Sequence, residues 1–312
     1  MQLEETGRFD LHIPEPFHFE RTVAKPAGWH WSTPEEHFSD GVLWSGITIN
    51  NTPFGLKLSA IRNTVHVTYF CLEPLSPAEI DELQSVVRYG LGADEDLAGF
   101  YRFAADDPVL SKAVHDLHGM RTGLLEDLFG GVILAILLQM APMARSTWMM
   151  TALLQHFGTR LDFDKQTVIL WPTPGAIAGL PVEELKSRAK LGYRAERLVR
   201  AAHYLLENPL SLIELSRMPE DEAIRQLTRI PGIGLYSAGI ILGHTSLPLD
   251  TWSVVILSEL FLRQTPERPR EEIDRVAAEL TRRWGKWRWF AFVYVLNDLD
   301  NLAKRYPLSR IT

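Results

Sequence analysis

The chain has 312 residues, of which 46% are hydrophobic and 23% charged, and its single cysteine, Cys71, excludes an intrachain disulfide and any metal site built on several thiolates. No apolar run approaches the roughly 18 residues of a membrane span, and the polar start MQLEETGRFD is unlike a signal peptide, so we expect a cytoplasmic or nucleoid protein without a membrane partner. The net charge of −7 is unevenly spread, because residues 1–130 hold 9 Lys and Arg against 20 Asp and Glu, whereas the remainder holds 23 against 19.

Residues 1–100 are predicted to form an antiparallel β domain with one covering helix. Segments rich in β-branched and aromatic residues, separated by Asn, Thr, Pro or Gly, predict strands at 17–23, 42–49, 54–61 and 64–72. After them, Ser76 and Pro77 open a segment whose apolar residues share one helical face, and Gly90 ends it.

From residue 101 to 312 the hydrophobic period is helical, so the predicted fold class is α+β. The stretch EDLFGGVILAILLQMA places Glu126 and Asp127 near the start of a buried helix, where acidic groups suit the helix dipole. YRAERLVRAAHYLL predicts a helix with arginines 194, 197 and 200 on its polar face, and PREEIDRVAAELTRRW predicts another that begins near Pro269.

The tetrapeptide PGIG joins two predicted helices by a very short connection. Gly232 and Gly234 remove the Cβ atoms that would hinder a tight turn or a close approach of the backbone to another group. Amides at the start of the second helix would be unpaired at the positive end of its dipole, which suits phosphate. A plain helix–helix turn fits the same residues.

The longer stretch LTRIPGIGLYSAGIILGH followed by LPLDTW resembles the helix-hairpin-helix, loop and aspartate of the HhH-GPD superfamily of DNA base-excision glycosylases, with the hairpin at 221–244. LLQMAPMARSTWMMTALLQHFG, LGYRAERLVRAA and WGKWRWFAFVYVL are similar to other helices of these enzymes. The N-terminal sheet resembles the antiparallel domain of bacterial 3-methyladenine DNA glycosylase II and of 8-oxoguanine DNA glycosylase. The resemblance covers nearly the whole chain.

The resemblance makes Asp250, sixteen residues beyond Gly234, the candidate catalytic residue. Cleavage of a nucleoside C1′–N bond passes through a cationic sugar, which a carboxylate can stabilise while it orients or deprotonates water. Asp250 also precedes a predicted helix, where it is a good N-cap, and the two roles are compatible.

Family members that also cut the DNA backbone carry a lysine two residues beyond the second hairpin glycine, where this chain has Tyr236. A lysine amine is needed for the Schiff base with the sugar. The substitution predicts a monofunctional enzyme that leaves an abasic site, without lyase activity.

The resemblance also implies how DNA would be held. The backbone at Gly232, Ile233 and Gly234 would bind a phosphate, and Met140 would be pushed into the gap that an extruded nucleotide leaves, unless it is simply the last core residue of its helix. Gln139 and Arg145 would reach the opposite base or a phosphate. The carbonyls of Thr228, Ile230 and Ile233 are the candidates for a hairpin-bound monovalent cation, and no other cofactor is expected.

Alkylated purines carry positive charge, so an aromatic pocket can attract them by cation–π contact. The candidate pocket residues are Tyr236, Trp252, Trp29, Trp31 and Leu296, although most of the nine tryptophans are expected to be core residues. Leu296 stands where relatives carry an aromatic residue, which leaves the substrate class open.

The sequence therefore predicts a monomeric, monofunctional glycosylase that acts on double-stranded DNA with damaged bases, most plausibly alkylated purines. Three alternatives remain at this point: an 8-oxoguanine or other damaged-base glycosylase, a noncatalytic helix-hairpin-helix DNA-binding protein, and a small-molecule nucleoside hydrolase. A pure binding module would not need Asp250, and a nucleoside hydrolase would not need the hairpin.

Overall fold

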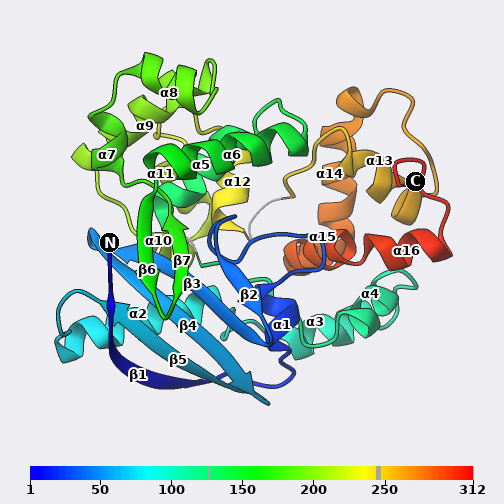
Figure 1. Cartoon of the computed structure of the whole chain (residues 1–312). Helices are drawn as coiled ribbons and strands as arrows, with labels where there is room; N and C mark the ends of the chain where they lie inside the picture. The colour runs from blue at the N-terminus through cyan, green and yellow to red at the C-terminus, as the bar shows by residue number, and fades with distance from the viewer. Residues whose placement is uncertain (126, 244–246, 312) are drawn as a thin grey trace.

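The computed structural model describes residues 1–125, 127–243 and 247–311. Glu126, expected near a helix start, and residue 244, the last of the predicted hairpin region, lie outside the described residues. The described chain forms a β-sheet layer and two helical lobes, each with its own hydrophobic core (Figure 1). The predicted α+β class, with the sheet at the N-terminal end, is confirmed.

The sheet layer is a five-stranded antiparallel sheet in the order β1-β5-β4-β3-β2. Its strands are β1 (Glu4–His12), β2 (His37–Ser39), β3 (Val42–Ile49), β4 (Thr52–Ile61) and β5 (Thr64–Cys71). Three of the four strands predicted from sequence are therefore confirmed, and 42–49 matches in both bounds. Alternating side chains of these strands, Leu43, Leu56, Leu58, Val65 and Val67 among them, are fully buried on one face.

The prediction of a strand at 17–23 is wrong, because Phe19–Val23 forms a short helix, α1. Phe19, Thr22 and Val23 are buried, and their spacing fits one face of a helix as well as part of a strand. The outer strand β1 was not predicted. Its second half does alternate, with Phe9 and Leu11 in the sheet core and Asp10 and His12 beside them, but its first half, EETGR, has no apolar side chain.

The predicted covering helix is α2 (Pro77–Gly90), and its bounds agree with the sequence signals. Ser76 accepts a hydrogen bond from the Glu79 amide, and the Glu79 carboxylate accepts one from the Ser76 amide, which is a capping box. Leu83 and Val87 on its inner face are fully buried in the core of the sheet layer.

The first helical lobe is built around α5 (Leu128–Leu138), whose residues are almost all buried. Asp127 caps this helix by accepting from the Gly130 amide, as its position predicts. The other helices of the lobe are α6 (Met143–Phe157), α7 (Pro174–Ala178), α8 (Val182–Arg188), α9 (Arg194–Glu207), α10 (Leu212–Arg217), α11 (Glu220–Leu227) and α12 (Leu235–Leu242).

A two-stranded hairpin, β6 (Thr159–Phe163) and β7 (Gln166–Leu170), joins the first lobe to the sheet layer. Leu161, Phe163 and Val168 form a small core with Phe70 of β5. The lobe is therefore fixed on the sheet by apolar packing as well as by chain connections.

The second helical lobe combines segments from both halves of the chain (Figure 1). It contains α3 (Leu97–Ala104), α4 (Leu110–Asp116), α13 (Ser253–Leu257), a π-turn at Ser258–Leu262, α14 (Pro269–Trp284), a 3₁₀ turn at Gly285–Trp287, α15 (Arg288–Asn297) and α16 (Leu299–Arg305). The domain boundary placed at residue 100 falls within α3. Within the described residues, no helix combines the length and apolarity needed to cross a membrane.

Candidate active site and nucleic-acid interface

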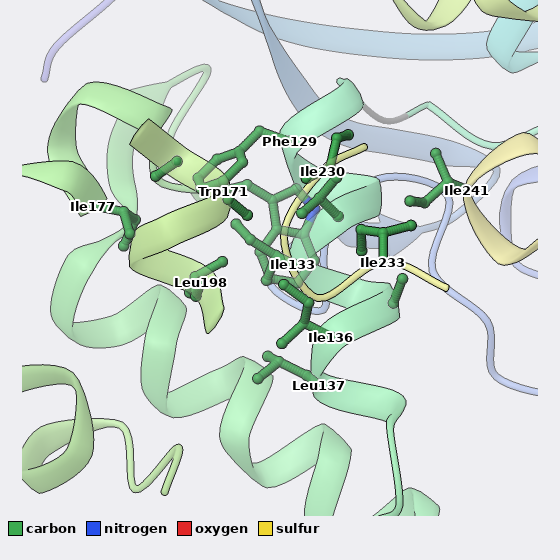
Figure 2. Close-up of a cluster of buried hydrophobic side chains, with 14 of the residues drawn as sticks. Phe129, Ile133, Ile136, Leu137, Trp171, Ile177, Leu198, Ile230, Ile233 and Ile241 are labelled. Atoms are coloured by element: carbon green, nitrogen blue, oxygen red, sulfur yellow. The ribbon is translucent and has the colours of Figure 1, made fainter. Parts of the chain in front are cut away.

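The glycine hairpin lies between α11 and α12 on the first lobe, as the sequence predicts. Ile230 and Ile233 are buried, and Figure 2 shows them beside Ile133 of α5, so the turn is fixed to the core of the first lobe by apolar packing. Gly232 has φ +89°, and a Cβ there would lie 3.3 Å from the Arg197 Cβ. Gly234 starts α12, and nothing lies within 4 Å of the position its Cβ would take.

The hairpin exposes unpaired backbone donors. Among the described residues, the amides of Gly232, Gly234 and Leu235 have no hydrogen-bond acceptor. They belong to a surface depression of about 620 Å³ whose lining also includes Arg197, Arg200 and Arg229. Unpaired amides at the positive end of a helix, surrounded by cations, make a site for an anion such as phosphate.

The three carbonyls predicted to hold a cation lie around the same turn. The Ile230 carbonyl already accepts the Ile233 amide at 3.0 Å, which closes the turn. A carbonyl oxygen has a second lone pair, so this bond leaves room for a cation contact. The residues present, including the carbonyls of Thr228 and Ile233, therefore fit a weakly held monovalent ion, for which backbone carbonyls are suitable ligands.

Asp250 lies at the entry to the second lobe, just before α13. Its Oδ1 accepts from the Trp252 amide at 3.0 Å, the Ser253 amide at 2.7 Å and the Ser253 Oγ at 2.8 Å. Asp250 therefore bonds amides of the turn that leads into α13 in the manner of a cap, but α13 begins at Ser253 with Trp252 in the N-cap position, later than the predicted start near Thr251. In the described part of the chain, Oδ2 accepts no hydrogen bond, and the residue is exposed. Oδ1 is thus fixed by hydrogen bonds, and Oδ2 is left open to a further contact.

Tyr236 and Trp252 accompany this carboxylate. Both are partly exposed, at 38% and 39%. Burial of its phenol and, secondly, the negative charge of Asp250 raise the pKa of Tyr236 to about 12. The influence of Asp250 on that pKa places its carboxylate within electrostatic range of the Tyr236 phenol in the first turn of α12, although the two residues belong to different lobes.

The remaining predicted pocket residues separate into two groups. Trp31 is fully buried in the sheet layer, where its Nε1 donates to the Gly90 carbonyl, so it does not line an open pocket. Trp29 packs instead against the core of the second lobe, to which Leu296 belongs. The Ala27 amide donates to Asn297 Oδ1, which ties the loop that carries Trp29 to the end of α15.

Met140 lies between α5 and α6 and projects into solvent. Its side chain is 83% exposed, so it is not a core residue of its helix. Its φ of +51° is unfavourable for a residue with a side chain. Arg145 is exposed in the first turns of α6. An exposed apolar side chain on a constrained backbone fits the predicted role of Met140 at a DNA gap.

Gln139 does not have the predicted freedom to contact a base. Its Nε2 donates to the Gly232 carbonyl at 2.8 Å and to Ser237 Oγ at 3.0 Å, and its Oε1 accepts from Arg197 at 2.6 Å. The side-chain amide is therefore committed to contacts within the protein.

Sequence reasoning did not single out a cluster formed by Tyr193, Arg194 and Arg197 at the start of α9. The two guanidinium carbons lie 4.6 and 4.7 Å from the centroid of the Tyr193 ring. Arg194, predicted on the polar face of its helix, is only 5% exposed. A sequence signal was present, because no acidic residue stands three or four positions from Arg194 or Arg197 to pair with them along the helix.

No family model matches the chain, but its sequence is similar to those of known DNA glycosylases. A DNA-3-methyladenine glycosylase of Bacillus subtilis (strain 168) is 23% identical over 264 residues, which is 82% of this chain and 86% of that protein. DNA-3-methyladenine glycosylase 2 of Escherichia coli (strain K12) is 27% identical over 181 residues, which is 57% of this chain and 60% of that protein.

Two solved structures share the fold over nearly their whole length. The 3-methyladenine DNA-glycosylase from Archaeoglobus fulgidus has a TM-score of 0.74 at 20% identity and covers 94% of this chain and 99% of its own. The Clostridium acetobutylicum 8-oxoguanine glycosylase/lyase in complex with double-stranded DNA has a TM-score of 0.71 at 17% identity and covers 96% and 98%. The predicted resemblance is confirmed.

Proposed function

We propose that this chain, a relative of the DNA glycosylases, is a monofunctional enzyme that removes damaged bases, alkylated purines above all, from double-stranded DNA and acts as a monomer. The observation that carries the proposal is Asp250, whose Oδ1 is fixed by three hydrogen bonds and whose Oδ2 is open. The hairpin, Tyr236 and Asp250 belong to one chain, so a single molecule holds the parts that the reaction needs.

The reaction breaks the bond between C1′ of the sugar and a nitrogen of the base, and water supplies the new oxygen on C1′. The bonding electrons leave with the base, so positive charge builds up on the sugar ring. Asp250 Oδ2 would stabilise that charge and accept a proton from the attacking water. Ser253 fixes Oδ1, which leaves the carboxylate little freedom to rotate away.

The hairpin would hold the DNA backbone beside this carboxylate. The unpaired amides of Gly232, Gly234 and Leu235 and the nearby Arg200 and Arg229 suit a phosphate. A monovalent cation on the carbonyls around Ile230 would add positive charge at the same place. Such contacts carry no sequence information, so binding is expected to be largely nonspecific and salt-sensitive.

Access to the glycosidic bond requires the nucleotide to leave the base stack, and Met140 would fill the space left behind. A flexible apolar side chain adapts to stacked bases and loses little by leaving water. Arg145, exposed in the first turns of α6, would contact a phosphate or the opposite base.

The preference for alkylated purines rests on Tyr236 and Trp252. Two partly exposed rings beside a carboxylate favour a cationic base, which cation–π contact attracts. With a pKa of about 12 the Tyr236 phenol is neutral at physiological pH, so it adds no charge of its own. Trp29, partly buried against the second lobe, would add a further wall, whereas Leu296 is only 8% exposed and belongs to the core of that lobe.

Tyr236 also supports hydrolysis without strand cleavage. A phenol cannot form the Schiff base through which lyases act, because that intermediate requires an amine. The product would then be an abasic site in an intact strand. A noncatalytic binding protein would need the hairpin amides but would gain nothing from the open oxygen of Asp250.

The test is to incubate the protein with duplex DNA that contains single lesions: 3-methyladenine, 7-methylguanine, hypoxanthine, uracil or 8-oxoguanine. We expect abasic sites, detected as alkali-labile breaks, from the two methylated purines. Release of 8-oxoguanine alone would replace the proposed substrate class, and release of none of these bases would leave only DNA binding.

A further inference from the structure

The residue before Met140 is connected to the hairpin through its side chain. Gln139 Nε2 donates to the Gly232 carbonyl at 2.8 Å and to Ser237 Oγ in the first turn of α12 at 3.0 Å. Gln139 belongs to the end of α5, 93 residues earlier in the chain than Gly232. One amide group therefore ties together the two parts that the proposed function assigns to phosphate binding and to gap filling.

The backbone of Gln139 is held as firmly as its side chain. Its carbonyl accepts from the Arg194 guanidinium and from the Tyr193 hydroxyl, the latter at 3.4 Å. Arg197 donates to its Oε1 at 2.6 Å, and both guanidiniums stack on the Tyr193 ring. Every polar atom of the Gln139 side chain and its carbonyl thus has a partner.

These contacts bear directly on the conformation of Met140. Because the peptide group that joins Gln139 to Met140 is planar, the fixed direction of the Gln139 carbonyl also fixes the direction of the Met140 N–H. The φ angle of Met140 is +51°, in the left-handed region, which residues other than glycine adopt uncommonly. Arg194 is 5% exposed and cannot readily move away, which makes the restraint stiff.

We infer that Gln139, Tyr193, Arg194 and Arg197 form a wedge clamp, a set of positioning residues that couples the hairpin to Met140. The clamp holds Met140 in its projecting conformation before DNA arrives, and it fixes the distance between the bound phosphate and the inserted side chain. Phosphate capture and gap filling are then one rigid-body event. The inference rests on the proposed function, because it needs DNA at the hairpin.

The clamp is tested with Gln139→Met, which keeps side-chain length and neutrality but removes all three side-chain hydrogen bonds. The readout is the fluorescence of a 2-aminopurine placed beside an abasic analogue in duplex DNA, which rises when the neighbouring nucleotide leaves the stack. Base release is measured in parallel from duplex and single-stranded DNA that contain 7-methylguanine. Gln155→Met, an exposed glutamine on α6, is the matched control.

We expect Gln139→Met and Met140→Ala each to lose about tenfold in duplex base release and in the fluorescence response. On single-stranded DNA, where no stack has to be opened, both variants should stay within about twofold of the parent protein. The double variant should be no worse than Met140→Ala alone, because the clamp acts through Met140. Gln155→Met should behave as the parent protein.

Independent, multiplying losses in the double variant would overturn the clamp, and so would an equal loss on single-stranded DNA. The fluorescence measurement does not require catalysis. If the parent protein everts the nucleotide but releases no base, the proposed function is wrong. The clamp is then still tested by the fluorescence response of Gln139→Met. A parent protein that produces no fluorescence response would overturn the clamp itself.

Discussion

Asp250→Asn separates the chemical role of Asp250 from its structural one. Asparagine caps helices about as well as aspartate, and its Oδ1 can accept the same bonds from the Trp252 amide and from the amide and Oγ of Ser253. What changes is the open position, where a neutral NH₂ replaces the anionic Oδ2. The substitution therefore removes the charge at the site and keeps the hydrogen bonds that position it.

The expected size of the effect follows from electrostatics. A carboxylate about 4 Å from a cationic sugar contributes about 4 kcal/mol at the effective dielectric constant of about 20 that suits a site near the surface. That energy corresponds to a rate decrease of about 10³-fold. The free energy of unfolding should change by no more than about 1 kcal/mol, because the cap is kept and only its charge is lost.

The assay is single-turnover release of 7-methylguanine from duplex DNA, with affinity measured on an abasic analogue and the free energy of unfolding measured in urea. Asp250→Asn should bind at least as tightly as the parent protein, because a negative charge near the phosphates has gone. Asp250→Ala, which also loses the cap, is the comparison that should cost about 1 kcal/mol of stability. Activity of Asp250→Asn within tenfold of the parent protein would refute the assigned role.

Three further results are expected. Borohydride treatment during the reaction should trap no protein–DNA adduct, since Tyr236 has no amine, and an adduct on a denaturing gel would show that a lysine attacks the sugar. Gly232→Ala, at φ +89° and 3.3 Å from the Arg197 Cβ, should lower stability by about 1 kcal/mol and weaken DNA binding, and an unchanged affinity would argue against phosphate at the hairpin. Burial raises the pKa of Asp127 from 3.8 to about 6, so its favourable contribution to stability is complete below pH 3.8 and is lost as the pH rises to about 6. Asp127→Asn should not show this loss in the free energy of unfolding, measured in urea, between pH 3.8 and about 6. The same pH dependence of stability in both proteins would contradict the raised pKa of Asp127.

The sheet layer shows which elements a sequence can reveal. β3 was predicted with both of its bounds because it is rich in β-branched and aromatic residues and is flanked by Gly41 and Asn50. β1 carries a shorter signal, since only Phe9 and Leu11 alternate with polar residues and its first half, EETGR, has no apolar side chain, and it is held by pairing with β5. In 17–23, buried residues at positions 19, 22 and 23 suit either period, so only the surrounding core could decide.

The candidate site divides in a similar way. Gly232, Gly234 and Asp250 were identified because backbone freedom and a carboxylate leave a mark in the local sequence. Trp29 and Trp31 look alike in PAGWHW, but one packs on the second lobe and the other is enclosed in the sheet layer. The partners of Gln139 lie on α9 and at the hairpin, far away in the chain, so no local pattern could show that its amide was already engaged.

The sequence by itself determined the chemical groups: a glycine turn that frees amides, a carboxylate shortly before a helix, and a tyrosine two residues beyond the second hairpin glycine. These properties belong to single residues and their near neighbours, so they can be read before folding is known. Only the tertiary structure decided how the groups meet. It brought the hairpin of the first lobe and Asp250 of the second together at Tyr236, and it fixed Met140 in a projecting conformation through distant arginines.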